Sequence, residues 1–360
     1  MWADSARQNA NLTLMLSRLT VDLDALAHNH GVLKAAAGGA EIAPVIKADG
    51  YGLGAGPVAR RLHAEGARTF FVARLEEGEA LRRELGAREA AILVLDGVKP
   101  ASISRLAAAT LTPVLATRDQ AEIWTGGLRV LHVDTGMNRS GVSLEQAQTL
   151  ASTGFRPDLV MSHLGSAGEP DNPRNAAQLE RFKAALALFP AARASLAATA
   201  GIYLSAEYRF DQVRPGIGLF GGGPREVPDD RFRAVALLTA PIVEIRALKA
   251  GDQVSYGATF TATDDMQIAI LPLGYTDGVL RTAHKRGAAW LDGAPARFVF
   301  ITMDLIAVDV TDRSAAPGDE VELLGVHARL DDLAAAAGSV AHECLVRLGA
   351  RTERVYVGAH

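Results

Sequence analysis

Eight short apolar runs, alternating with helical segments, constrain the fold of this chain more than any other feature. The runs are Ala43–Ala48, Thr69–Ala73, Ala91–Leu95, Thr112–Ala116, Val130–Asp134, Leu159–His163, Ser195–Ala198 and Val213–Arg214. Between them, Leu75–Leu85 and Ala176–Leu188 carry apolar residues at steps of three and four, which predicts helices with outward polar faces. This alternation predicts an α/β fold whose first part is a (β/α)8 barrel.

The pattern changes after the eighth run. Gly221–Asp230 is rich in turn formers and predicts a linker. From Ala234 onward, short strand-like runs broken by turns predict a second, mostly β domain. The segment Leu19–Leu23 alternates like a strand and is expected to join that second sheet. The predicted domains are residues 24–230 for the barrel and residues 231–360 with 17–23 for the β domain.

Composition excludes several classes of protein. A chain of 360 residues, 49% hydrophobic and 22% charged, is globular and too long for one ordinary core. A net charge of −4 with both signs mixed gives no reason to expect a nucleic-acid or membrane partner. Cys344 is the only cysteine and lies in an apolar run, so we expect a buried, inert thiol. No run is long enough to span a bilayer, Met1–Leu16 lacks a signal-peptide plan, and a cytoplasmic location is expected.

Active sites of such barrels lie at the carboxyl ends of the strands. The residues predicted there are Lys47, Arg139, His163, Thr199 and Arg214. Three of the five carry a positive charge, and a cationic cluster at the mouth of a barrel suits an anionic ligand.

Lys47 ends a wholly apolar run. A lysine that leaves a buried strand loses hydration, so its pKa falls and its neutral amine can form an imine. Position alone favours the ordinary alternative, a lysine at a strand end whose charge points to solvent.

The string around Lys47 changes this interpretation, because residues 45–54 resemble the cofactor-lysine signature of the alanine racemase family. Further strings resemble motifs of that family in the same order through both predicted domains. They are Asp134–Arg139, Arg214–Phe220, Val254–Thr259, Gly274–Gly278 and Thr302–Asp304. Six ordered motifs are far more specific than one, and they are the basis of the resemblance.

The resemblance implies a two-base chemistry on pyridoxal 5′-phosphate. Lys47 would carry the cofactor and exchange protons on one face of the substrate α-carbon. Tyr256, reaching in from the partner subunit of a homodimer, would serve the opposite face, since a proton removed from one side must be delivered to the other. The alternative for Tyr256 is a half-buried strand tyrosine. No metal ion is implied.

Arg214 would sit at the pyridine nitrogen of the cofactor. Because arginine keeps its proton, that nitrogen would stay unprotonated, which disfavours side reactions such as transamination. His163 would hydrogen-bond Arg214 from behind. The alternative for His163 is a satisfied histidine at a strand end.

The remaining matches are implied contacts to phosphate and substrate. Tyr51, Thr199 and the backbone of Gly216 and Ile217 would bind the phosphate, although glycine here also fits simple turn chemistry. The substrate carboxylate would be bound by Arg139 with the backbone of Met303, and Tyr275 would lie at the entrance; a solvated loop arginine is the alternative for Arg139.

Three positions depart from the family pattern. His132 stands where many members have a carbamylated lysine that positions the carboxylate arginine. Ala198 stands where the family usually has asparagine, and Gly349–Thr352 offers no tyrosine where several members place one. None of these positions supplies a proton-transfer group, so they bear on cofactor affinity and substrate preference.

The leading prediction is an enzyme that interconverts L- and D-alanine and feeds peptidoglycan synthesis. A racemase of wider specificity, for serine or basic amino acids, is the near alternative. A pyridoxal-phosphate decarboxylase of the same build should have a carboxylate in place of Arg214 and a catalytic cysteine in the β domain, where Cys344 matches no motif. A non-catalytic cofactor-binding barrel would have no need of Tyr256 or Tyr275.

Overall fold

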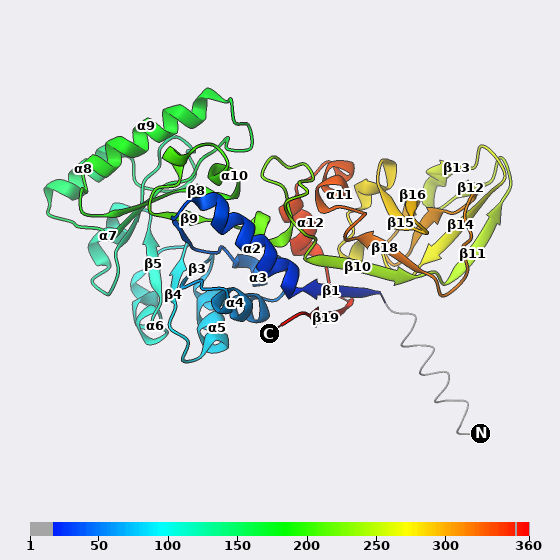
Figure 1. The fold of residues 1–360 in the computed structure, drawn as a ribbon, viewed down its shortest axis with the longest axis horizontal. Coiled ribbons are helices and arrows are strands. Elements are labelled where there is room, and N and C mark those ends of the chain that lie inside the picture. The colour runs from blue at the N-terminus through cyan, green and yellow to red at the C-terminus, as the bar shows by residue number, and fades with distance from the viewer. Residues whose placement is uncertain (1–16, 350, 360) are drawn as a thin grey trace, which may run out of the picture. The chain divides into compact units, whose positions relative to one another are not determined.

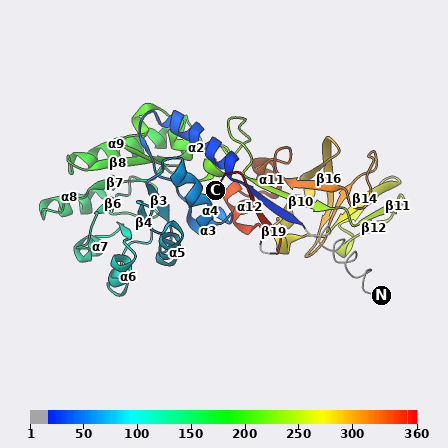
Figure 2. The ribbon, with the colours of Figure 1, turned by 60° about the horizontal axis from the view of Figure 1, so that its bottom comes forward.

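The computed structural model describes residues 17–349 and 351–359 and divides into two compact units. One unit is Leu26–Arg225, and the other joins the chain before Leu26 to Glu226–Ala359. The change from one unit to the other therefore falls inside the turn-rich segment Gly221–Asp230. Figure 1 and Figure 2 show helices around strands in the first unit and mostly strands in the second.

Eight parallel strands form the barrel of the first unit, as predicted. They are β2 (Glu41–Ile42), β3 (Thr69–Val72), β4 (Ala91–Val94), β5 (Thr112–Leu115), β6 (Val130–His132), β7 (Leu159–Met161), β8 (Arg193–Ala198) and β9 (Gln212–Arg214). Their order is β2-β9-β8-β7-β6-β5-β4-β3. The chain after β2 bonds to β3 through Ile46 N to Phe71 O, 2.9 Å, and Phe71 N to Pro44 O, 2.8 Å, which joins the two ends of the sheet.

The strand interiors explain why these runs are apolar. Side chains from successive strands meet in one buried cluster of Ala43, Phe71, Leu93, Val114, Val130, Leu159 and Met161. Burying this cluster is the main driving force for closing the sheet. Because both faces of each strand are covered, the strands read as continuous apolar runs rather than alternating ones.

Helices cover the outside of the strands (Figure 1, Figure 2). They are α2 (Leu23–Ala37), α4 (Ala55–Ala64), α5 (Leu75–Leu85), α6 (Ile103–Ala108), α7 (Arg118–Ile123), α8 (Leu144–Ser152), α9 (Pro173–Ala187) and α10 (Thr199–Ile202). Single 3-10 turns lie at η1 (Pro100–Ser102), η2 (Ala206–Tyr208) and η3 (Ile217–Phe220). The helix predicted at Leu75–Leu85 is confirmed, and α9 begins earlier than predicted because Asn172 caps it and Pro173 fits its first turn.

The second unit is a mixed sheet with two short helices. Its strands are β1 (Arg18–Asp22), β10 (Ala236–Pro241), β11 (Glu244–Leu248), β12 (Gln253–Val254), β13 (Phe260–Thr261), β14 (Met266–Leu271), β15 (Ala288–Leu291), β16 (Ala294–Ile301), β17 (Ile306–Asp309), β18 (Glu320–Leu324) and β19 (Glu353–Val357). Nine of them run in the order β11-β14-β17-β16-β15-β18-β10-β1-β19, and β12 pairs with β13. The helices are α11 (Leu330–Ala337) and α12 (Ala341–Arg347).

The N-terminal strand joins this sheet, as its alternation predicted. β1 pairs antiparallel with β10 and parallel with β19. Leu19 and Val21 are fully buried, while Arg18 on the alternate face is exposed, which is the period-two pattern of a half-buried strand. The predicted architecture of a barrel followed by a mostly β domain is confirmed.

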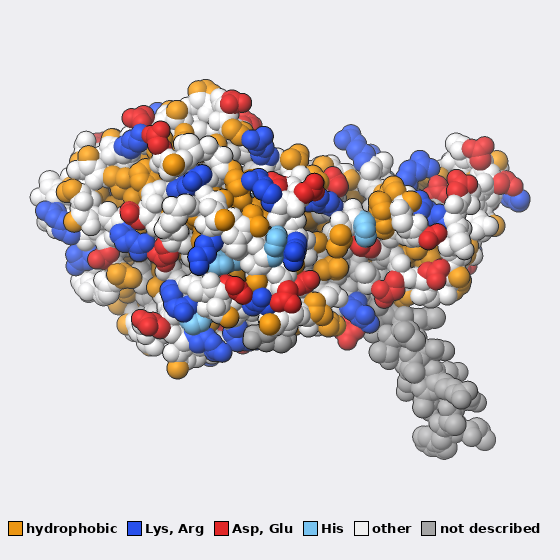
Figure 3. Space-filling model, viewed as in Figure 1, with side chains coloured by type: hydrophobic (Ala, Val, Ile, Leu, Met, Phe, Trp, Pro, Cys, Tyr) orange, Lys and Arg blue, Asp and Glu red, His pale blue; other side chains and the backbone are white. Residues whose placement is uncertain are grey.

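The expectations for the cysteine, for membrane-spanning segments and for surface charge can be compared with the described residues. Cys344 lies buried in α12 and burial raises the pKa of its thiol to about 11, which confirms an inert cysteine. Within residues 17–349 and 351–359, no helix has the length and apolar character needed to cross a membrane. Figure 3 shows acidic and basic side chains interspersed over the visible face. Met1–Leu16, where no signal peptide was expected, lies outside the described residues.

Candidate active site

Lys47 begins an unusual turn rather than ending a strand. The predicted strand Ala43–Ala48 is therefore wrong in its bounds: the paired strand is Glu41–Ile42, and α3 (Lys47–Tyr51) follows an extended stretch. Residues 48–51 have φ values of 54°, 54°, 65° and 57°, the left-handed region, which costs non-glycine residues roughly 1–2 kcal/mol each.

The surroundings of Lys47 favour its neutral form. The side chain is half-buried, and burial lowers the pKa of its amine. The positive charge of Arg139 lowers that pKa further, while the carboxylate of Glu77 raises it. A lysine with a lowered pKa holds more neutral amine near neutral pH, as an imine-forming or proton-abstracting group requires.

Tyr51, Thr199 and Gly216 meet in one place, which we call the anion cradle. The N–H groups of Gly216 and Gly218 donate to the Thr199 Oγ1 over 3.1 and 3.3 Å. A Cβ on Gly216 would clash with the Tyr51 hydroxyl. Burial raises the pKa of Tyr51, so its phenol keeps its proton and is a hydrogen-bond donor. Hydroxyl and backbone donors gathered in this way suit an anionic ligand.

Arg214 is buried at the end of β9 and is held by three hydrogen bonds. Its guanidinium donates to the Ser195 hydroxyl at 2.6 Å, to the carbonyl of Ser162 at 2.5 Å and to that of Leu196 at 3.3 Å. Burial lowers the pKa of Arg214 to about 10, so it remains charged at neutral pH. In the described part of the chain its hydrogen bonds go to these groups rather than to the His163 ring, in contrast to the implied arrangement.

His132 and His163 lie close to these cations and are neutral at physiological pH. Burial, followed by the charges of Arg214 and Arg139, lowers the pKa of His132 to about 4 and that of His163 to about 3. His132 therefore contributes no charge toward Arg139. The carboxylate of Asp134 acts in the opposite direction and raises the pKa of His132.

Asp134 shapes the loop that carries Arg139. Its Oδ1 accepts hydrogen bonds from the backbone N–H of Gly136, Met137 and Asn138, at 2.8, 2.9 and 3.2 Å. These bonds stabilise the ionised carboxylate and fold the loop tightly, with Asn138 in the left-handed region. Arg139 follows this loop and is exposed, as a ligand-binding arginine at a strand end would be.

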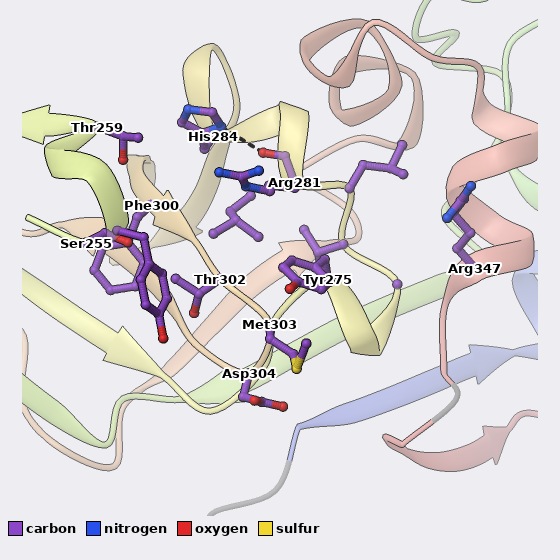
Figure 4. Close-up of a pocket in the computed structure, with 15 residues that line it drawn as sticks. Ser255, Thr259, Tyr275, Arg281, His284, Phe300, Thr302, Met303, Asp304 and Arg347 are labelled. Carbon is purple, nitrogen blue, oxygen red and sulfur yellow. Dashed lines mark hydrogen bonds between the residues drawn. The ribbon is translucent and has the colours of Figure 1, made fainter.

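The predicted residues of the β unit surround a separate cavity. Tyr256, Tyr275 and Met303 are 83%, 41% and 51% exposed, unusually high for side chains of this size. All three line a cavity of about 680 Å³ (Figure 4). Figure 4 shows Arg281 on one side of this cavity and Met303 on the other. Large exposed apolar side chains grouped together mark a surface that receives a partner or ligand.

Three segments hold this cavity in shape, including one that lacks the family tyrosine. Arg351 donates from Nε and Nη2 to the two carboxylate oxygens of Asp277, at 3.0 and 2.8 Å, and from Nη1 to Asp304 at 2.7 Å. Thr276 Oγ1 donates to the Met303 carbonyl at 2.7 Å. Within Gly349–Thr352, the segment without the family tyrosine, Ala350 lies outside the described residues. Arg351 was not singled out from the sequence.

Both halves of the chain match one family. Residues 21–224 match the alanine racemase N-terminal domain, and residues 235–356 match the alanine racemase C-terminal domain. The chain is 39% identical to the alanine racemase of Rhizobium meliloti, with 95% of this chain and 97% of that protein covered. It is 42% identical to the alanine racemase of Rhodospirillum rubrum, with 94% and 96% covered.

Solved structures agree with the sequence matches. Alanine racemase from Bartonella henselae, with covalently bound pyridoxal phosphate, superposes with a TM-score of 0.89 at 31% identity over 95% of this chain and 99% of that chain. Alanine racemase from Acinetobacter baumannii gives 0.88 at 31% identity over 95% and 100%.

The barrel has parallel strands, and at their ends lie the anion cradle and a lysine whose pKa is lowered by burial. This arrangement defines an enzyme that works on an anionic ligand through an amine. Given the matches to both of its domains, the chain belongs to the alanine racemase family. The resemblance drawn from six ordered motifs is confirmed. The individual roles of the site residues stay predictions.

Proposed function

We propose that this chain interconverts L-alanine and D-alanine with pyridoxal phosphate as its cofactor, and so supplies D-alanine for peptidoglycan synthesis. The observation that carries the proposal is the position of Lys47, which is half-buried at the start of the left-handed turn that also supplies Tyr51 to the anion cradle. Burial also lowers the pKa of its amine. Relatives named alanine racemase support alanine as substrate, and both forms of Agrobacterium fabrum, named biosynthetic at 40% identity and catabolic at 37%, are among them.

The anion cradle fits a phosphate. Thr199 Oγ1 already accepts two backbone hydrogen bonds, so its own hydrogen is left to donate to a ligand oxygen. Tyr51 adds a protonated phenol, and Ile217 begins η3, where the N–H has no partner within that turn. Arg214, held by Ser195 and Ser162, would face the pyridine nitrogen as a donor that keeps its proton. When bound, pyridoxal phosphate withdraws electrons from the substrate α-carbon and so makes its proton removable.

The chain's own residues then supply the proton transfer. Lys47 Nζ, as a neutral amine, takes a proton from one face of the α-carbon or returns it there. Tyr256 of the partner subunit serves the other face with its phenol. Its 83% exposure in the single chain is expected of a residue that completes a neighbour's site. The proposal therefore includes a homodimer in which each β domain completes the partner's barrel site.

The substrate carboxylate would be bound by Arg139, whose loop Asp134 fixes, and by the backbone N–H of Met303 from the partner. Because His132 is neutral, it adds no negative charge that would compete with the substrate carboxylate for Arg139. Tyr275 would line the entrance to this site. A cytoplasmic location without nucleic-acid or membrane partners belongs to the same proposal and agrees with a mixed surface of net charge −4.

Two alternatives differ in what they need from the site. A decarboxylase of this build needs a catalytic cysteine, and Cys344 is buried with a raised pKa. A racemase of wider specificity needs no change in the proton-transfer groups. Incubating the cofactor-loaded protein with single enantiomers of alanine, serine, lysine and arginine, followed by chiral chromatography, tests both. We expect alanine to reach equal amounts of both enantiomers fastest; faster conversion of serine or a basic amino acid, or release of carbon dioxide, would contradict the proposal.

A further inference from the structure

Glu77 links the helix α5 to the turn that carries Lys47. Its Oε2 accepts hydrogen bonds from the backbone N–H of Ala73 and Arg74, at 2.7 and 3.2 Å, as a glutamate in a first helical turn commonly does. Its Oε1 instead reaches Ala48 N at 2.9 Å, a residue 29 positions away in the sequence. One carboxylate therefore ties the start of a helix to the peptide that directly follows Lys47.

The turn depends on such contacts, because its backbone conformation is unfavourable for the residues present. Ala48 and Asp49 both have φ of 54° without being glycine. Later in the turn, Gly50 N donates to Ile46 O at 2.9 Å, and the Asp49 side chain accepts from Ala55 N, at the start of α4, at 2.8 Å. At the first peptide, the Ala48 N–H is held by Glu77. The contact from Glu77 thus fixes the direction in which the chain leaves Lys47.

Glu77 also sets the charge balance around the amine. Of the charged groups that act on Lys47, Arg139 lowers the pKa of the amine and Glu77 raises it, and the nearby His163 is neutral at physiological pH. Glu77 thus supplies negative charge near the amine from within the described part of the chain. It opposes the effect of burial and keeps the amine from losing its proton too readily.

We propose that Glu77 is a positioning residue for Lys47. The carboxylate of Glu77 fixes the left-handed turn and supplies negative charge near the amine of Lys47. The inference rests on the proposed function of Lys47 as the cofactor-bearing base. Both oxygens of Glu77 accept from backbone N–H donors, so the position requires an acceptor on both sides. Glutamine has nearly the same shape, but its NH2 group would face a donor on one side.

The test uses the protein without cofactor and compares Glu77→Gln with the matched control Glu76→Gln. Glu76 is the preceding residue, is exposed and pairs with Arg105 at 3.2 Å, away from the turn. Acetic anhydride labelling of Lys47 across a pH series, read by peptide mass spectrometry, gives the titration midpoint of the amine. In Glu77→Gln we expect this midpoint to fall by about one pH unit, because the opposing charge is gone. Hydrogen exchange at the Ala48 amide should be at least about tenfold faster.

The control should match the original protein in both measurements. An unchanged midpoint together with unchanged exchange at Ala48 in Glu77→Gln overturns the proposal. Should Glu77→Gln fail to fold, Glu77→Asp decides, because it keeps the charge but is one methylene shorter. Its midpoint should stay near the original while exchange at Ala48 rises, and original exchange in this variant refutes the positioning role. Borohydride reduction of the cofactor-loaded protein, followed by peptide mapping, separately tests whether Lys47 carries the cofactor, so failure of either idea is recognised by itself.

Discussion

Tyr51 occupies the space beside Gly216 that the Cβ of any other residue would need. The Tyr51 ring is buried and packs on Phe220 with ring centroids 4.8 Å apart, so it has little room to move aside. The two residues come from opposite ends of the barrel sequence and form two sides of the anion cradle. Glycine at position 216 is therefore required by close approach, not by an unusual φ.

Gly216→Ala should weaken pyridoxal phosphate binding about tenfold or more, because overpacking of this size costs about 1–3 kcal/mol. Absorbance titration of the cofactor-free protein measures the dissociation constant. Gly168→Ala is the control, since a Cβ there meets only an ordinary contact at 3.7 Å. Equal affinities in the two variants would show that the cradle does not bind the phosphate.

The buried histidines predict a loss of stability in mild acid. Unfolded histidine binds a proton below about pH 6.5, whereas folded His132 stays neutral to about pH 4 and His163 to about pH 3. The unfolded state binds more protons in this window, so the free energy of unfolding falls as pH falls, by about 1.4 kcal/mol per pH unit for each histidine. Urea unfolding at several pH values gives the free energy of unfolding, and its slope against pH between 6 and 4.5 should be shallower in His132→Gln. Measurement of both proteins at pH 8 serves as the reference. The same slope in both proteins would contradict this account.

Arg351 should matter for the stability of the β unit. In the described part of the chain, the buried carboxylate of Asp277 accepts hydrogen bonds from Arg351 and from the Gly274 N–H, the latter at 2.8 Å. Removing Arg351 leaves this carboxylate with the Gly274 bond alone. Arg351→Ala should therefore lower the free energy of unfolding by more than the loss of an ordinary exposed ion pair does. Arg347→Ala, which loses an exposed pair with Glu343 one helical turn away, should cost about 0.5 kcal/mol or less. If both variants lose the same free energy of unfolding in urea, Arg351 does not stabilise the β unit through Asp277 and Asp304.

The sequence predicted what depends on local pattern. The eight barrel strands, the helix Leu75–Leu85 and the joining of Leu19–Leu23 to the second sheet follow from periodicity, which is a property of neighbouring residues. The left-handed turn at residues 48–51 could not be predicted, because non-glycine residues adopt it only when distant groups hold them there.

Partners of the site residues were missed for a related reason. The Ser195 hydroxyl and the backbone carbonyl of Ser162 hold Arg214. A strand serine carries no signal of what its hydroxyl accepts from, and a backbone carbonyl carries no sequence signal at all. Arg351 reaches Asp277 and Asp304 across 74 and 47 positions, and only the folded sheet brings them together. Motif resemblance finds residues that touch ligands, whereas those that position them depend on tertiary contacts.

The proposed shared site predicts rescue between two inactive variants. Lys47→Ala and Tyr256→Phe would each disable one base, and a mixed dimer would contain one doubly altered site and one intact site. After the two are unfolded together and refolded, about a quarter of all sites should work if pairing is random. Racemisation assays of the mixture and of each parent measure this. A mixture as inactive as its parents, although refolded original protein recovers, would place both bases on one chain.

The central claim is that Lys47 moves the α-proton of alanine in a reaction that inverts its configuration. The direct measurement is incubation of L-alanine with the cofactor-loaded protein in deuterium oxide, followed by chiral separation and mass spectrometry. We predict D-alanine that carries deuterium at its α-carbon, rising until the enantiomers are equal, and no D-alanine from Lys47→Ala. L-alanine that keeps both its configuration and its α-proton, in protein shown by absorbance to hold the cofactor, would contradict the account.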